Sequence, residues 1–278
     1  MTHQSLVKPP LVMGIVNVTP DSFSDGGRHA TIEAALAHAM RMIDQGADVL
    51  DIGGESTRPG SEPVGEAEEI ARVTPLIAAI RARWDGRISI DTMKPGVARA
   101  AVAAGATMWN DVTALSHAPD SLATAAELGC EVVLMHMKGA PKTMQDDPRY
   151  DDVVAEVVAH LAARAEAAMA AGVAREKIWL DPGIGFAKTT AHNLTLTARL
   201  DALVDLGFPV LYAASRKRLI QDVDETAVAA TDRLGGSLAL AMEGARRGAR
   251  MVRVHDVRET VQALKVQAAV ADLFSVRR

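Results

Sequence analysis

Short apolar runs that end in polar residues recur along the chain, with helical patterns between them. The first run, from Leu11 to Val16, stops at Asn17 and passes into a polar loop that contains glycine. Seven further runs predict strands at about 48–54, 87–91, 107–110, 131–136, 177–181, 209–214 and 249–254. Such nearly continuous apolar character is typical of parallel strands covered on both faces. The pattern therefore predicts a parallel sheet buried beneath helices.

Apolar residues at i, i+3 and i+4 spacing predict helices between these strands. Thr31 is the expected N-cap of the first helix, and Gly46 is its expected end. Asp256 and Glu259 are expected to cap the last helix together. Other helices are expected at about 66–83, from 147 to 172, at 196–207 and at 232–247.

Eight strand and helix units follow one another without a linker, a low-complexity segment or a change in composition. Eight units in 278 residues predict an α/β fold, a single (β/α)8 TIM barrel. An open doubly wound sheet would carry a glycine-rich dinucleotide turn after its first strand, and this sequence has none. We expect one domain over residues 1–278, with a core of about 11–273.

Composition narrows the classes of function. The chain is 49% hydrophobic and 23% charged, which favours a sizeable core. Its net charge of -5 argues against nucleic acid and anionic membranes as partners. Cys130 is the only cysteine, which excludes an internal disulfide and a cysteine-rich zinc site, and we expect it to be a buried apolar group. With neither a signal-like segment nor a long apolar stretch, a cytoplasmic location is expected.

Polar side chains stand at the ends of the predicted strands, and in such a barrel these ends meet at the face that holds the active site. They are Asn17, Gly53 to Thr57, Asp91, Asn110, His136, Asp181, Ser215 to Lys217 and Arg253 to His255. Carboxylates only accept hydrogen bonds, so the two aspartates suit a heterocycle rich in N–H donors. Cations on the last two strands suit a phosphate or pyrophosphate.

Each of these residues also has a simpler interpretation. Asp91 and Asp181 equally suit helix caps, and Asn110 suits a turn. His136 has no second histidine or cysteine at ligand spacing, which favours a core histidine over a metal ligand. Residues 216–218 are consistent with a solvated run of charge.

Several ordered motifs at these strand ends resemble the dihydropteroate synthase family of pterin-binding barrels, from Leu11 to about Arg258. They are Asn17 to Gly27, Gly53 to Gly60, Ser89 to Thr92, Asn110-Asp111, Met135 to Met137, Asp181 to Phe186, Ser215 to Lys217 and Arg253 to Asp256. One such motif is a weak signal, whereas the ordered set is a strong one. The resemblance implies a transferase that joins 4-aminobenzoate to 6-hydroxymethyl-7,8-dihydropterin pyrophosphate, giving 7,8-dihydropteroate and pyrophosphate in folate biosynthesis.

The resemblance also implies roles for individual residues. The expected catalytic residues are Asp91, Asp181 and Lys217. The residues expected to hold the pterin are these three, Asn110 and, as an apolar neighbour, Phe186. Those expected to hold the pyrophosphate are Asn17, Arg253 and His255, with Asn17 also reaching a Mg2+ cofactor. Those expected to enclose the aminobenzoate are Thr57, Arg58 and Pro59. A homodimer is implied as well.

The chain departs locally from the family pattern at Ala213, Ala187 and Arg218, where glycine, glycine and serine are common. Arg218 stands where the aminobenzoate carboxylate usually docks, so it either pairs with that group or points outward. Two other functions share the barrel: a methyltetrahydrofolate-dependent corrinoid methyltransferase and a non-catalytic pterin-binding paralogue. Thr57 to Gly60 and Ser215 to Lys217 argue against the methyltransferase. The residues expected to hold the pyrophosphate argue against the paralogue, whereas Arg218 keeps that alternative open.

Overall fold

Eight parallel strands form the centre of the molecule. The computed structural model describes residues 9–18, 27–56, 62–139, 144 and 147–275. The strands are β1 (Leu11–Asn17), β2 (Val49–Gly53), β3 (Arg87–Asp91), β4 (Met108–Asp111), β5 (Glu131–Met135), β6 (Ile178–Asp181), β7 (Leu211–Tyr212) and β8 (Met251–Val254). They pair in the order β6-β5-β4-β3-β2-β1-β8-β7. A parallel bridge between Leu180 and Val210 joins β6 to the segment that enters β7, so the sheet closes into the predicted barrel.

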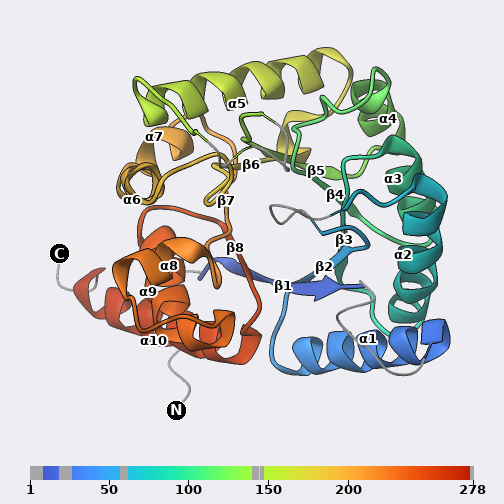
Figure 1. The fold of residues 1–278 in the computed structure, drawn as a ribbon, viewed down its shortest axis with the longest axis horizontal. Helices are drawn as coiled ribbons and strands as arrows, with labels where there is room; N and C mark the ends of the chain where they lie inside the picture. Colours follow the sequence, from blue (N-terminus) through green and yellow to red (C-terminus); the bar gives the residue numbers. More distant parts are fainter. Residues whose placement is uncertain (1–8, 19–26, 57–61, 140–143, 145–146, 276–278) are drawn as a thin grey trace.

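Helices surround this barrel, as Figure 1 shows. The helices that cover the first half are α1 (Gly27–Asp44), α2 (Glu66–Arg81), α3 (Pro95–Ala103), α4 (Ser121–Leu128) and α5 (Val153–Ala170). Those of the second half are α6 (Thr190–Ala198), α7 (Asp201–Val204), α8 (Arg218–Val223), α9 (Leu234–Arg246) and α10 (Val257–Ser275), with short 3-10 turns η2 (Arg175–Lys177) and η3 (Ala230–Arg233). No helix in the described part of the chain is long and apolar enough to span a membrane.

Three predicted helix boundaries were wrong. The fifth helix begins at Val153 because the Asp152 carboxylate accepts hydrogen bonds from the N–H groups of Val154 and Ala155, at 2.9 and 3.0 Å. The first helix begins at Gly27, ahead of the expected cap Thr31. The helix expected at 196–207 is instead the end of α6 followed by the separate α7. The apolar periodicity located each helix, but local hydrogen bonds determined its ends.

Two apolar layers hold the barrel together. The larger lies between the sheet and the helices, and it includes many alanines, such as Ala98 and Ala101 of α3. The smaller fills the barrel interior with one side chain from each of seven strands, and it comprises Met13, Val49, Met108, Val133, Trp179, Leu211 and Met251. Cys130 is buried and free, as predicted. The packed interior leaves chemistry to the strand ends.

Candidate active site at the barrel mouth

Alternation along the strands explains why polar side chains gather above the inner core. Every second residue of a strand points to the same face. In the even-numbered strands β2, β4, β6 and β8, the residue two positions after the inner apolar side chain therefore also points inward, and it is polar. These residues are Asp51, Asn110, Asp181 and Arg253. These positions lie at or near the carboxyl ends of the strands, where barrel active sites form.

One charged network crosses the β2, β3, β4 and β8 side of the mouth. The Arg253 guanidinium donates from Nε to Asp51 Oδ2 at 2.5 Å and from Nη2 to Asp91 Oδ2 at 2.8 Å. Asn110 Nδ2 donates to the same Asp51 oxygen at 3.2 Å. The Oδ1 atoms of Asp51 and Asp91 are buried and have no hydrogen-bond partner among the described residues. The network thus retains unused acceptors, which a donor-rich ligand can satisfy.

Asp181 lies in β6 and is held differently. Its Oδ1 accepts the Gly183 N–H at 2.7 Å, and the side chain is almost fully buried. The helix-cap interpretations of Asp91 and Asp181 were wrong. Thr189 caps α6 through the His192 N–H, and α3 begins after Lys94 without a side-chain cap. Both carboxylates therefore remain at the mouth.

Burial shifts the protonation of both aspartates. It raises the pKa of Asp91 to about 7, against the opposing effect of the Arg253 charge. It raises the pKa of Asp181 to about 6, against the Gly183 N–H and the Lys217 charge. Two buried carboxyl groups whose pKa values are raised toward neutrality, and on which the same Arg253 charge acts, indicate a functional cluster.

The three basic residues after β7 separate instead of forming one solvated run. Lys217 lies over the Phe186 ring, with its Nζ 4.2 Å from the ring centroid. Arg216 donates hydrogen bonds to both carboxylate oxygens of Asp256, at 3.0 and 2.5 Å. Asp256 is the residue that was expected to cap α10, and its carboxylate binds Arg216. The Arg218 side chain is 86% exposed and its Nε lies 3.6 Å from Asp222 Oδ1. Of the two positions considered for Arg218, the structure has the outward one.

Gly185 allows Lys217 to approach Phe186. A methyl group on Gly185 would lie 3.0 Å from Lys217 Cδ. The residue also has a φ of +81°, which favours glycine. The β6 loop thus places an aromatic face and an ammonium group beside Asp181.

His255 and Asn17 lie at the ends of neighbouring strands. Ser215 Oγ accepts the His255 N–H at 3.2 Å and lies 3.0 Å from His255 Nδ1. If the hydroxyl donates to Nδ1, the ring proton is on Nε2. Asn17 ends β1, and its Oδ1 would lie 3.7 Å from a methyl group on Gly53, next to Asp91. Of the predicted site residues, Thr57, Arg58 and Pro59 lie outside the described part of the chain.

Two charged residues in the site were not singled out from the sequence. Asp51 is fully buried in the middle of β2. In the sequence it could have been recognised as a single carboxylate within an apolar run. Lys188 is 3% exposed, and its Nζ lies 3.0 Å from Nδ1 of His136. His136 is buried at the end of β5, as the core interpretation predicted. In the described residues no cluster of three or more histidine, cysteine or acidic side chains could hold a metal.

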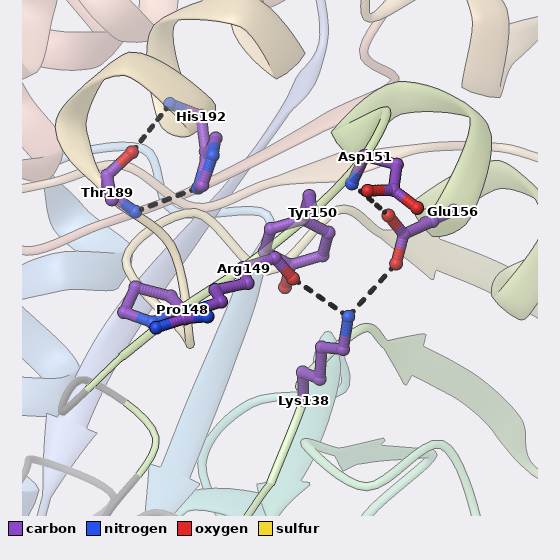
Figure 2. A pocket seen from close by; sticks show the side chains of 8 residues that line it. All are labelled: Lys138, Pro148, Arg149, Tyr150, Asp151, Glu156, Thr189 and His192. Atoms are coloured by element: carbon purple, nitrogen blue, oxygen red, sulfur yellow. Dashed lines mark hydrogen bonds and ion pairs between the residues drawn. The ribbon is translucent and has the colours of Figure 1, made fainter.

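A separate cavity of about 680 Å3 lies beyond the ends of β5 and β6, and Figure 2 shows its polar wall. Its described lining residues are Lys138, Pro148, Arg149, Tyr150, Asp151, Glu156, Thr189 and His192. None of these residues was predicted to bind substrate. The candidate site remains the cluster over the inner core.

Comparison with known proteins identifies close relatives. Residues 13–255 match the model of the pterin binding enzyme family. Dihydropteroate synthase of Escherichia coli K12 is 49% identical over 260 residues, which cover 94% of this chain and 91% of that protein. The enzyme of Neisseria meningitidis serogroup C is 48% identical over 94% of this chain and 93% of its own.

Solved structures are similar over the same extent. Dihydropteroate synthase of Xanthomonas albilineans with 4-aminobenzoic acid has a TM-score of 0.89 and 52% identity, covering 95% of this chain and 93% of that one. The same enzyme in complex with 7,8-dihydropteroate has a TM-score of 0.86 and 49% identity, over 95% and 94% of the two chains.

Proposed function

Because the chain belongs to the pterin binding enzyme family and to its dihydropteroate synthases, we propose that it condenses 4-aminobenzoate with 6-hydroxymethyl-7,8-dihydropterin pyrophosphate. The products are 7,8-dihydropteroate and pyrophosphate. One observation carries the proposal: the buried Oδ1 of Asp91 has no partner among the described residues. The aminopyrimidinone edge of a pterin supplies the N–H donors that such an oxygen needs.

The pterin ring is proposed to lie over the charged network, with its donor edge toward Asp91 and Asp181. Asn110 is already oriented by Asp51, so its amide is fixed before the ligand arrives. Lys217 and Phe186, which contact each other, border the ring from the β6 and β7 side. Aspartate, amide and ammonium groups thus surround one flat heterocycle, which fixes its orientation.

The pyrophosphate is proposed to lie at the β1 and β8 side, near Asn17, Arg253 and His255. Arg253 also donates hydrogen bonds to Asp51 and Asp91, so it connects the carboxylates proposed to lie under the pterin with the leaving group. Mg2+ keeps several water ligands and takes phosphate oxygens with only one or two protein groups. The single amide oxygen of Asn17 fits such an ion, which when bound neutralises charge on the pyrophosphate.

We propose a dissociative reaction. The bond between the pterin methylene and the pyrophosphate oxygen breaks, and its electron pair leaves with pyrophosphate. The aminobenzoate nitrogen then forms the new C–N bond, and the proton that it loses passes to water or to the released pyrophosphate. Asp91 and Asp181, when ionised, stabilise the positive charge that develops on the pterin, and the cations stabilise the leaving group. An arylamine is neutral, so it needs no strong general base.

The decisive experiment is release of pyrophosphate by the purified chain with and without 4-aminobenzoate. We expect release and formation of dihydropteroate only when both substrates and Mg2+ are present. Methyl transfer from methyltetrahydrofolate without pyrophosphate release would favour the corrinoid enzyme. Pterin binding without turnover would favour the non-catalytic paralogue.

We also propose that the protein is a homodimer that works in the cytoplasm. Val266, Val270 and Leu273 of α10 are exposed to 59%, 51% and 61%, and their spacing places them on one side of the helix. An apolar stripe of this kind suits a second copy of the chain. Light scattering should give twice the chain mass, and Val270→Glu should lower it. A monomeric wild-type protein would refute the dimer.

A further inference from the structure

Lys188 is a buried lysine that pairs with no carboxylate among the residues that the structure describes. Its side-chain ammonium donates to Phe186 O at 2.9 Å, Gly183 O at 3.1 Å and His136 O at 3.4 Å. The fourth neighbour is His136 Nδ1 at 3.0 Å. Burying an ammonium costs free energy unless its donors are satisfied. Here the carbonyl groups of three residues supply acceptors for it.

Two of the atoms that Lys188 contacts, Gly183 O and Phe186 O, belong to the loop that carries residues proposed to bind the pterin. The Gly183 N–H donates a hydrogen bond to Asp181 Oδ1, and the Phe186 ring lies against the Lys217 ammonium. Ala187, in the same loop, has a φ of +51°, which is unfavourable for a residue with a Cβ atom. Strained backbone persists only where surrounding contacts hold it, and Lys188 binds two carbonyl groups of this loop.

Two more contacts brace the same loop from outside. The Tyr150 hydroxyl donates to Ala187 O at 2.9 Å. Asn193 accepts the Gly185 N–H at 2.8 Å and donates to Lys188 O at 3.4 Å. The loop is thus held from α6, from the segment before α5 and from within. Of these contacts to the loop backbone, the one from Lys188 brings a positive charge.

That charge lies among titratable groups of several elements. Burial lowers the pKa of Lys188 to about 7, the Asp181 charge from β6 opposes this shift, and the Lys217 charge after β7 adds to it. His136 at the end of β5 and His160 of α5 both have lowered pKa values, to about 3 for His136, so they are neutral at pH 7. The Lys188 charge in turn lowers the pKa of Asp181. Protonation of Lys188 therefore supports the ionised Asp181.

We propose that Lys188 is a positioning residue of the pterin pocket: its ammonium fixes the loop from Gly183 to Phe186 and helps to keep Asp181 ionised. Lys188 does not touch the substrate and acts through these groups. The inference rests on the proposed dihydropteroate synthase activity. If the wild-type chain releases no pyrophosphate, that activity fails before Lys188 is tested.

The test compares Lys188→Met with Lys138→Met. Lys138 lies on the same side of the barrel but is 52% exposed, and Figure 2 shows it facing Glu156 and the Arg149 carbonyl. Calorimetry with dihydropterin pyrophosphate and Mg2+, without 4-aminobenzoate, measures binding apart from turnover. We expect Lys188→Met to weaken binding by about 10- to 100-fold and Lys138→Met to leave it within about twofold of wild type.

The pH profile separates positioning from general loss of structure. Wild-type affinity should rise as Asp181 and Asp91 ionise, with pKa values of about 6 and 7, and it should fall above pH 7 as Lys188 loses its proton. Lys188→Met should lose the alkaline fall, and its acidic rise should move to higher pH because a cation near Asp181 is gone. Lys138→Met should keep both limbs.

Three results would overturn the proposal. One is a folded Lys188→Met protein that binds the pterin like wild type. Another is a weakened variant whose two pH limbs are unchanged, which would mean a purely structural role. If Lys188→Met does not fold, the wild-type profile decides, since affinity that does not fall above pH 7 contradicts the role of the charge.

Discussion

The two buried aspartates of the mouth are stabilised in different ways. Asp91 lies opposite a guanidinium, with Arg253 Nη2 at 2.8 Å. Asp181 accepts a backbone N–H, and the Lys217, Arg253 and Lys188 charges act on it from a distance. The pKa of both aspartates is nevertheless raised, because burial outweighs either arrangement. A direct ion pair locks one acid in place, whereas the second acid depends on the loop around it.

Removal of the Arg253 guanidinium should have the largest effect on stability, because it takes away the ion pair that distinguishes Asp91 from Asp181. Arg253→Met leaves Asp51 and Asp91 buried without their cation, and loss of one member of a buried pair costs about 3 to 5 kcal/mol. Urea denaturation at pH 8 should report this loss, with a smaller loss at pH 5, where the carboxyl groups accept protons. Arg216→Met is the matched control, since the Arg216–Asp256 pair is more exposed. Equal losses in the two variants would contradict the special status of the Arg253 network.

The charge of Asp181 should matter more for catalysis than for binding. Asp181→Asn keeps the shape but removes the charge that stabilises the cationic pterin, so kcat should fall about 100- to 1000-fold. The Kd for dihydropterin pyrophosphate should rise less. Asp111→Asn is a control for the loss of a buried structural carboxylate, because Asp111 accepts the N–H groups of Thr113 and Leu115 in a turn. Equal losses in kcat and binding for Asp181→Asn would remove the electrostatic part of the mechanism.

Ionisation of Asp91 should cost stability. Its pKa is raised from an ordinary 3.8 to about 7, so the folded protein binds more protons than the unfolded chain between these values. Stability should therefore fall as pH rises from about 4 to 7. Asp91→Asn should flatten this slope. Its free energy of unfolding relative to wild type should be higher at pH 8 than at pH 4 by on the order of 4 kcal/mol, and activity should be lost. If the dependence of stability on pH is the same in Asp91→Asn as in wild type, groups other than Asp91 cause it.

Arg218 should have the smallest effect. It is exposed and lies 3.6 Å from Asp222 Oδ1, and such surface pairs contribute about 0 to 1 kcal/mol. Arg218→Ala should leave the KM for 4-aminobenzoate within about twofold of wild type and Tm almost unchanged. A tenfold increase in that KM would mean that Arg218 turns inward to meet the aminobenzoate carboxylate.

The barrel itself was predictable because its signals are local. Each strand is a short apolar run, and each covering helix repeats its apolar residues at helical spacing. Helix ends such as Val153 were not, because they depend on single caps. Asp51 was missed for a related reason: one charge in an apolar strand is informative only once the inward face of the barrel is known.

By itself, the sequence determined the order of strands and helices, the side of the barrel that carries polar residues and the family motifs. Only the tertiary structure decided which charges are partners. Arg253 meets Asp51 across 202 positions of the chain, and Arg216, Lys217 and Arg218 point to three different environments. Strand pattern is a property of neighbours in sequence, whereas ion pairing and burial depend on barrel closure, which brings distant strand ends together.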